Sequence, residues 1–417
     1  MRGDLDRPAF IGGNRELWRV LDRAGRLLAL IVALRIVVLG IAAIALLYAG
    51  NYRRFYDVAT RWPRLGAPTF ASHFMAWDGA HYQFLAENGY VHNAESCAFY
   101  PLWPALVSLT LRMGLPTPIG ALILANLFSA VGLTLLHLWV NSRYGVDVAR
   151  WTLALMLLYP GAIFLMLPYS ESLFLFLLVG AFVSLESRST IWASIFGFAL
   201  PLCRGNGVFV ILPILFYTYA KVREEAERRR NLVVESPGIG KSNLLRIFEA
   251  LKPRDAVPVA MPVLGWATYL LLVWTSTGDA FEGFRAQRFW GHRHSISNLI
   301  DPIKFVTELL TPTSWHGFVG STVDRLTFLV LISSVPVILR KREWVFGWIP
   351  MLLVIPAMSG SFTSFLRYGA TCFPCFVAFG VMAGSRKERQ ALWVVATLMG
   401  LLQMLCLWRF LNFEWVG

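Results

Sequence analysis

The stretch LLALIVALRIVVLGIAAIALLYA, residues 27–49, is 23 residues long and carries one charged side chain, Arg35. About 20 consecutive apolar residues are enough to cross the hydrocarbon core of a bilayer as a helix, so this stretch predicts a membrane span. It is longer than the roughly 7–15 apolar residues of a cleaved signal peptide, and we expect a retained signal anchor. Two interpretations of Arg35 stay open: it snorkels to the cytoplasmic interface, or it contacts a lipid phosphate.

The rest of the chain also has the composition of a membrane protein. Of its 417 residues, 56% are apolar and 15% are charged, whereas soluble domains carry about 25% charged residues. Disordered, collagen-like and disulfide-stapled classes are thereby excluded. We expect a single all-α polytopic domain over residues 1–417, with about 11 spans of which the shorter ones are tilted or broken helices. The apolar spans are 27–49, 119–141, 151–167, 169–185, 190–202, 204–220, 257–277, 326–339, 344–358, 365–384 and 391–411.

Basic residues are unevenly distributed between the segments that join these spans, and basic loops stay in the cytoplasm. Two long segments, 50–101 and 278–325, together hold only nine Lys and Arg. The net charge of +13 therefore reflects topology and anionic lipids, and no nucleic-acid partner is expected. The segments predicted to be cytoplasmic hold 24 Lys and Arg, and they are 1–26, 142–150, 186–189, 221–256, 340–343 and 385–390.

This charge bias predicts a cytoplasmic N-terminus and two outer loops, 50–118 and 278–325. Residues 102–114 then form an interfacial or re-entrant helix within the first outer loop. The cytoplasmic loop 221–256 begins with a charged run, EEAERRR at 224–230, which we expect to extend the preceding helix.

Two short motifs carry no chemistry in this interpretation. PGIGKS at 237–242 lacks the first glycine of a phosphate loop, since the chain has Glu235 there, and no strand precedes it. Cys372 and Cys375 have CxxC spacing but lie in an apolar span. We interpret them as packing residues rather than a redox or metal site, and we expect no structural disulfide, since only Cys97 belongs to an outer loop.

The first outer loop contains MAWDGAHYQFLAENGY at 75–90. Asp78 falls near a predicted helix N-terminus, where the helix dipole favours an ionised carboxylate. Tyr82 lies one turn further along the same helix face, while Trp77 and His81 contribute to a stripe that could lie on the bilayer. The alternative is that Asp78 only caps the helix.

The motif AFYPLWP at 98–104 follows, with two prolines among aromatic residues. It predicts a rigid turn back into the membrane. Tyr100 and Trp103 suit an interfacial aromatic belt, and they equally suit stacking on a sugar ring.

Four further polar motifs interrupt apolar sequence or follow it. By the predicted topology Asp78, Glu171, Arg204 and Arg367 all lie at the outer level of the membrane, where charges usually face a cavity or a partner. The alternative is two internal ion pairs that hold the bundle together. The motifs are PYSES at 168–172, LCRGNG at 202–207, FRAQRFWGHRH at 284–294 and FLRYG at 365–369.

Taken in order, WDGAHYQFLAENGY, AFYPLWP, PYSESLF, CRGNG, the Gln287–Trp290 segment and RYG resemble the PIG-V family of glycosylphosphatidylinositol mannosyltransferases, in the form of a prokaryotic relative. The resemblance runs from about residue 70 to residue 380. It implies a GT-C-like bundle whose first outer loop bears an acidic residue, and it implies that this residue, Asp78, is the catalytic base. The residues expected to bind donor or acceptor are Trp77, His81, Tyr82, Tyr100, Trp103, Tyr169, Glu171, Arg204, Asn206, Gln287, Arg288, Trp290, Arg367 and Tyr368.

The resemblance implies transfer of a hexose, in this family mannose, from a polyprenyl or dolichyl phosphate to a lipid- or glycan-linked hydroxyl, with inversion. The partners are then the lipid-phosphate sugar, the acceptor and membrane lipids. We expect no cofactor, leave a divalent metal open, and place the active site on the extracytoplasmic face of a bacterial plasma membrane. The rivals are a transporter or flippase of lipid-linked sugars, which often shows the internal repeats missing here, and a non-catalytic membrane scaffold.

Overall fold

A computed structural model describes residues 14–50, 69–232, 253–290, 296–341, 347–359 and 362–417. Within these residues the chain is helical, and the only extended pairing is an isolated bridge between Ser314 and Ser321. The prediction of an all-α polytopic membrane protein is confirmed. The PGIGKS motif at 237–242 lies outside the described residues.

Six helical segments of the described chain are long and apolar enough to cross a membrane. Two of them are interrupted: a short helix, η4 (Gly205–Val210), precedes α9, and α14 is followed closely by α15. Among the six, α1 covers the predicted span 27–49. The long segments are α1 (Asn14–Ala49), α5 (Thr117–Tyr144), α9 (Ile211–Leu232), α11 (Pro253–Thr277), α14 (Thr322–Ile332) with α15 (Val335–Lys341), and α19 (Arg386–Leu411).

The remaining predicted spans are short or broken, so the count of 11 stays a prediction. Span 151–167 divides at Tyr159, which is extended because a proline follows it. Span 365–384 divides into α17 and α18, with Pro374 in the first turn of α18. The shorter elements are η1 (Ala71–His73), α3 (Asp78–Asn88), η2 (Glu95–Ala98), α4 (Leu102–Arg112), α6 (Val146–Leu158), η3 (Pro160–Leu165), α7 (Glu171–Glu186), α8 (Thr190–Cys203), α12 (Glu282–Ala286), η5 (Gln287–Trp290), η6 (Ile296–Ile300), α13 (Pro302–Leu310), η8 (Pro350–Val354), α16 (Ile355–Ser359), α17 (Phe365–Gly369) and α18 (Phe373–Met382).

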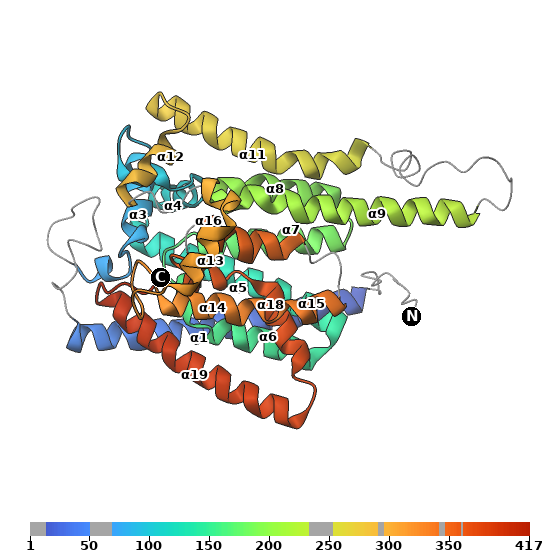
Figure 1. Ribbon diagram of the computed structural model, residues 1–417. Helices are drawn as coiled ribbons and strands as arrows, with labels where there is room; N and C mark the ends of the chain where they lie inside the picture. Colours follow the sequence, from blue (N-terminus) through green and yellow to red (C-terminus); the bar gives the residue numbers. More distant parts are fainter. Residues whose placement is uncertain (1–13, 51–68, 233–252, 291–295, 342–346, 360–361) are drawn as a thin grey trace.

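The long helices lie side by side with α7 and α8, and several of the shortest helices lie at one end of the bundle (Figure 1). Helices α3 and α4 of the first predicted outer loop share this end with α12 of the second. The far end of α9, which continues through the charged run 224–230 to Leu232, projects from the opposite end. The two predicted outer loops therefore lie on one side, and the predicted helical extension is confirmed.

Arg35 lies inside the bundle, with 3% of its surface exposed. Its guanidinium donates to the Ser129 hydroxyl and, at 3.1 Å, to the carbonyl of Leu165. Both sequence interpretations of this side chain, snorkelling and a lipid phosphate, are therefore wrong. Arg35 instead links α1 to α5 and η3, at a point where the Ser129 hydroxyl also donates to the carbonyl of Leu165 at 2.8 Å.

All five cysteines are buried and free of disulfides. This agrees with the interpretation of Cys372 and Cys375 as packing residues. Cys97, expected in an outer loop, is buried there, and its thiol donates to the carbonyl of Val91 at 3.0 Å.

Candidate active site

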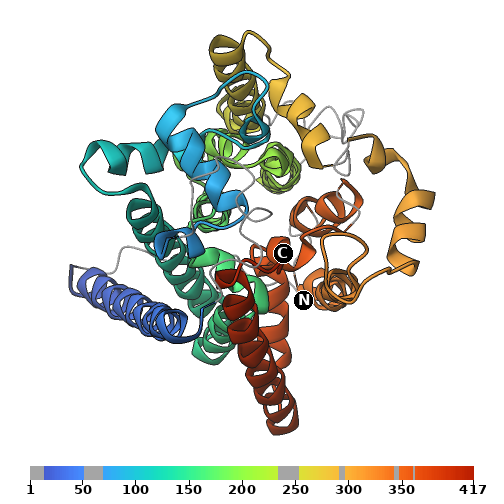
Figure 2. The ribbon, with the colours of Figure 1, turned by 90° about the vertical axis from the view of Figure 1, so that its left-hand side faces the viewer.

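A cavity of about 770 Å³ opens among the short helices at the end of the bundle. Its walls come from α3, the turn before α4, the α8–η4 junction, α11, η5, α16, α17 and the side chain of Trp415. Figure 2 looks onto this end of the molecule and shows the helices arranged around a central region. Because these segments are far apart in the sequence, they form a cavity only when the chain is folded.

Asp78 is the first residue of α3, so its carboxylate lies at the positive end of the helix dipole. Trp77 occupies the cap position with φ 57°, and the helix has no side-chain cap bond. Asp78 is therefore not the helix cap. Its Oδ2 accepts a hydrogen bond of 2.5 Å from Nη1 of Arg367, and 15% of its side chain is exposed.

The four predicted charges form one continuous network. Nε of Arg367 lies 2.7 Å from Oε1 of Glu171, and Arg204 donates to the same carboxylate oxygen. The order is therefore Asp78, Arg367, Glu171, Arg204, with two charges of each sign. Glu171 is 1% exposed and is absent from the cavity wall, whereas the other three line it.

Hydroxyl groups connect this network to α3. The side chain of Tyr82 shares a hydrogen bond of 2.8 Å with Ser170, and Ser170 accepts one of 3.2 Å from Arg204. The Tyr169 hydroxyl donates to the carbonyl of Ala76 at 2.8 Å, which fixes the backbone just before Asp78. Burial raises the pKa of Tyr82 far above its usual value, so this phenol stays neutral and can donate to a ligand.

The turn that carries Arg367 is held by two side chains that are distant from it in the sequence. Oδ1 of Asp324 accepts from the backbone N–H of Leu366 at 2.6 Å, and the Tyr159 hydroxyl donates to the carbonyl of Leu366 at 2.8 Å. Ser364, just before this turn, has φ 61°, a conformation that costs a residue with a side chain about 1 kcal/mol or more. The two bonds hold the turn in place.

The hydrogen bond from the Leu366 N–H to Asp324 leads to a prediction for Asp324→Leu. We expect a loss of about 1–3 kcal/mol of stability, because the Leu366 N–H is left buried without an acceptor. Arg367 would then no longer be fixed at the cavity wall. The measurement is thermal unfolding. Asp324→Asn keeps an acceptor oxygen and should lose less stability. Equal losses of stability in both variants would show that the hydrogen bond to the Leu366 N–H does not hold the turn.

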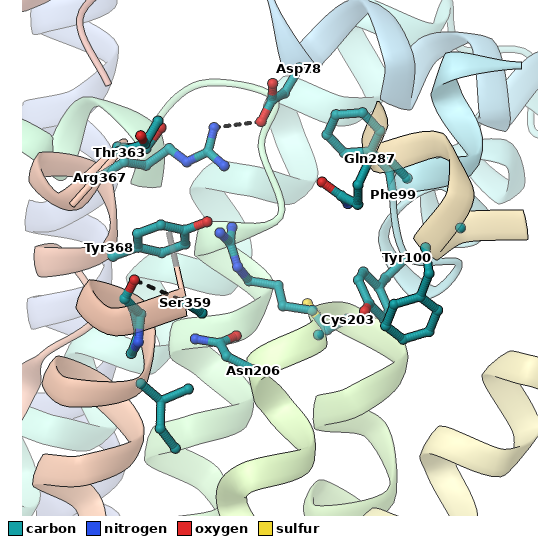
Figure 3. A pocket seen from close by; sticks show the side chains of 18 of the residues that line it. Asp78, Phe99, Tyr100, Cys203, Asn206, Gln287, Ser359, Thr363, Arg367 and Tyr368 are labelled. Carbon is teal, nitrogen blue, oxygen red and sulfur yellow. Dashed lines mark hydrogen bonds and ion pairs between the residues drawn. The ribbon is translucent and has the colours of Figure 1, made fainter. Parts of the chain in front are cut away.

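The opposite wall of the cavity is aromatic. Phe99, Tyr100 and Gln287 face the wall that carries Arg367 and Tyr368 (Figure 3). The ring of Tyr100 packs on Tyr269 at 4.5 Å, and burial raises the pKa of Tyr100 to about 12. The guanidinium of Arg204 lies 5.0 Å from the ring centre of Tyr368, a distance at which a cation is attracted by the ring.

The structure brings most of the predicted site residues to the cavity wall and places the others elsewhere. Trp103 and Tyr169 are buried in the core, Glu171 lies behind the arginines, and Arg288 donates to Asn93 away from the cavity wall. Trp290 ends η5, but its side chain lies outside the described part of the chain. The predicted residues that line the cavity are Trp77, Asp78, His81, Tyr82, Tyr100, Arg204, Asn206, Gln287, Arg367 and Tyr368.

Sequence reasoning missed other parts of the wall. Trp266 and Tyr269 of α11 line the cavity, but in an apolar span they are indistinguishable from packing residues. Thr363 and Ser364 also line it, and their nearness in sequence to Arg367 was a usable signal. Phe318 and Trp415 had no such signal, because only the folded chain brings them to the site.

No group of three or more His, Cys, Asp or Glu side chains is arranged to hold a metal in the described residues. The acids at the cavity are instead paired with arginines. The expectation that no cofactor is needed stays a prediction.

The fold and site define a helical membrane protein with an acid- and arginine-lined cavity at one end. Residues 66–231, which carry Asp78, Glu171 and Arg204, match the family model described as Mannosyltransferase (PIG-V). The resemblance found in the sequence motifs is thereby confirmed over this region.

Part of the chain is also similar to curated mannosyltransferases. The chain is 32% identical over 163 residues to GPI alpha-1,6-mannosyltransferase 2 of Cricetulus griseus, covering 35% of this chain and 31% of that protein. It is 34% identical over 148 residues to the Mus musculus protein, covering 32% and 29%. The match thus spans less than a third of the length of either relative.

Solved structures of Archaeoglobus fulgidus oligosaccharyltransferase are also similar. The structure tethered with an acceptor peptide aligns at a TM-score of 0.43 and 11% identity, covering 91% of this chain and 55% of that one. The complex with an inhibitory peptide and a dolichol-phosphate gives 0.41 and 12%, covering 92% and 56%. Scores at this level do not establish a common fold, so the GT-C-like architecture stays a prediction.

Proposed function

We propose that this protein is an integral-membrane mannosyltransferase that moves a hexose from a polyprenyl phosphate to a hydroxyl of a lipid- or glycan-linked acceptor. The observation that carries the proposal is the placement of Asp78, Arg204 and Arg367 around one cavity. Two of these residues lie in the segment that matches the mannosyltransferase family. A base and two cations are the groups that transfer from a lipid phosphate needs.

The arginines bind the phosphate of the donor. A guanidinium offers paired N–H donors that match phosphate oxygens and stabilise the charge that develops as the phosphate leaves. Arg204 and Arg367 are both fixed by the buried Glu171, which positions them before the substrate arrives. The bilayer delivers the lipid-linked donor to the end of the bundle where they lie.

Asp78 takes the proton of the acceptor hydroxyl. As the acceptor oxygen forms a bond to the anomeric carbon, the bond from that carbon to the phosphate oxygen breaks, and the electron pair leaves with the phosphate. Asp78 is ready for this role once Arg367 turns from its carboxylate to the donor phosphate. General base catalysis of this kind contributes about 10²–10⁴-fold.

A single displacement inverts the anomeric centre. Retention would need a second carboxylate as nucleophile, about 5–5.5 Å from the first and open to the sugar. Glu171 is the other acid of the network, and it is 1% exposed and forms ion pairs with both arginines. Its burial supports inversion.

The proposal is tested by mannose transfer in proteoliposomes. The purified protein receives radiolabelled polyprenyl-phosphate mannose and a lipid extract, and the label is followed by chromatography. A transferase moves the label into a new glycolipid. A flippase, the rival function, moves unchanged donor across the bilayer, and that outcome would contradict the proposal.

We further propose that the N-terminus is cytoplasmic and that the cavity opens on the extracytoplasmic side, in a bacterial plasma membrane. Because all native cysteines are buried, single cysteines can report sidedness. We expect Val91→Cys, near the cavity end, to react with a membrane-impermeant maleimide on intact cells. Val146→Cys, after α5 has crossed the bundle, should react only after permeabilisation. Both positions are exposed, and the reverse pattern would invert the topology.

A further inference from the structure

Helix α13, in the second predicted outer loop, presents an apolar face to its surroundings. Asp301 caps the helix by accepting from the backbone N–H of Lys304 at 2.9 Å. Ile303 and Leu310 are 78% and 72% exposed, and Val306 between them is also exposed. Residues with this spacing of three and four positions lie on one side of a helix. The three side chains therefore form a continuous apolar face that the described part of the chain leaves uncovered.

The charged residues of α13 are instead held by partners in the protein. Nζ of Lys304 donates to the Asn298 side chain at 2.9 Å. Arg325 donates through Nε to the carbonyl of Glu308 at 2.5 Å, and its Nη2 lies 3.5 Å from the Glu308 carboxylate. Thr307, which is also exposed, is uncharged. A helix that faces water has its charged residues outside and its apolar residues inside, so α13 is arranged for an apolar environment.

The contacts of α13 place it beside the first two turns of α14. Arg325 belongs to the first of these turns, and the ring of Phe305 packs on Phe328, with ring centres 5.8 Å apart. Since a helix rises 1.5 Å per residue, these partners lie within about 10 Å of Thr322, the first residue of α14. Helices that lie in the membrane interface bury their apolar face to about the same depth, 5–10 Å.

We propose that α13 is an interfacial membrane helix, whose Ile303, Val306 and Leu310 enter the leaflet on the side of the cavity at the boundary between headgroups and acyl chains. The helix, orange in Figure 2, lies at the rim of the ring of helices, where lipid can reach it. Trp315, in the segment after α13, is 73% exposed, and tryptophan is enriched at membrane–water interfaces. This inference does not depend on the proposed transfer reaction.

A lipid surface fits this face better than a second protein does. The adjoining helix α14 also exposes apolar side chains, those of Leu326, Leu329 and Val330, and it belongs to a segment long and apolar enough to span a membrane. Specific protein interfaces bury about 800 Å² on each partner, which is more than three aliphatic side chains provide. The apolar face of α13 is thus the outer margin of a lipid-facing surface.

The membrane contact also bears on the cavity. Asn298, which holds Lys304, donates through Nδ2 to the carbonyl of Ser359 at 3.0 Å. Ser359 lines the cavity, and so does Leu299, the neighbour of Asn298 in the chain. Two hydrogen bonds therefore join α13 to the cavity wall, so that a helix held in the leaflet anchors η6 and α16.

Quenching by lipids tests the membrane contact. Because the native cysteines are buried, a bimane label on Ile303→Cys reports this face alone. In nanodiscs whose lipids carry bromine near the carbonyl end of the acyl chains, its fluorescence should fall at least about twofold, and bromine near the methyl end should quench it less, as expected for a shallow helix. A label on Val330→Cys, deeper along α14, should show the reverse order.

Val91→Cys is the matched control. Val91 is exposed, but its exposed neighbours His92 and Asn93 are polar, and we expect neither brominated lipid to quench a label there. If Ile303→Cys behaved like Val91→Cys, or if bromine near the methyl end quenched it best, the interfacial position would be overturned. Protection of the label from both bromine and aqueous iodide would indicate a protein partner and would also overturn it.

Hydrogen exchange tests whether α13 anchors the cavity wall. Ile303→Asp places a charge in the apolar boundary, so α13 should leave the leaflet, and amide exchange in η6 and α16 should rise at least about threefold. Exchange in the buried helix α7 should stay slow, which shows that the bundle is folded. Ile303→Val and Val91→Asp should match the wild type. Unchanged exchange of η6 and α16 in Ile303→Asp would overturn the anchoring role.

Discussion

Replacing Asp78 by Asn should lower the rate of mannose transfer by about 10²–10⁴-fold, the usual contribution of a general base. The side chain keeps its shape but can no longer take a proton from the acceptor hydroxyl. Binding of the donor should change little, because Arg204 and Arg367 keep their common partner Glu171. The measurement is single-turnover transfer at saturating donor, with the donor KM determined in parallel.

Glu87→Gln is the matched control for this substitution. Glu87 lies on the same helix, is exposed, and accepts hydrogen bonds from Gln83 and Thr117 rather than from an arginine. Its loss of charge should leave the rate within about twofold, since surface interactions contribute little. If Asp78→Asn kept more than a tenth of the wild-type rate, Asp78 would not be the base.

Replacing Glu171 by Leu should produce the largest loss of stability. The buried carboxylate is the partner of two arginines, and removing one member of a buried ionic group typically costs about 3–5 kcal/mol because the remaining charges are left uncompensated. The loss should appear as a lower unfolding temperature. A thiol-reactive dye can report it, because the five cysteines are buried in the folded chain.

A second substitution tests the reason for this loss. In Glu171→Leu with Arg204→Leu, Arg367 still has Asp78 as a partner, so part of the lost stability should return without any return of activity. Glu224→Leu is the control, because it breaks a more exposed pair in which the side chain of Arg188 is 46% exposed and that of Glu224 is 29% exposed. It should cost at most about 1 kcal/mol of stability. Additive losses in the double variant would show that Glu171 and Arg204 do not interact.

The long elements of the fold could be predicted from sequence, because span length and the distribution of basic residues are local properties. The span at 27–49, the charged extension of α9 and the gathering of both predicted outer loops at one end all follow from them. The breaks at Tyr159 and within 365–384 were harder to place. Proline marks a break, but its consequence depends on the packing of neighbouring helices.

The charges of the site could be predicted for the same reason. Arg204 and Arg367 each occur at the outer end of a predicted span, and Asp78 lies in the outer loop at the same level, where a charge needs a partner. Sequence could not tell which charges line the cavity and which lie behind it: only the fold puts Glu171 between the two arginines. Arg35 shows the limit most clearly, since its partners Ser129 and Leu165 are 94 and 130 residues away.

The most direct test of the central claim is a cryo-electron microscopy structure of the full chain in nanodiscs with a phosphonate analogue of polyprenyl-phosphate mannose, whose C–P bond resists transfer. We expect the phosphonate within about 3 Å of the guanidinium groups of Arg204 and Arg367. Arg367 should then have released Asp78, whose carboxylate should face the side of the anomeric carbon opposite the phosphonate. A phosphonate bound away from both arginines, with the Asp78–Arg367 pair intact, would contradict the account.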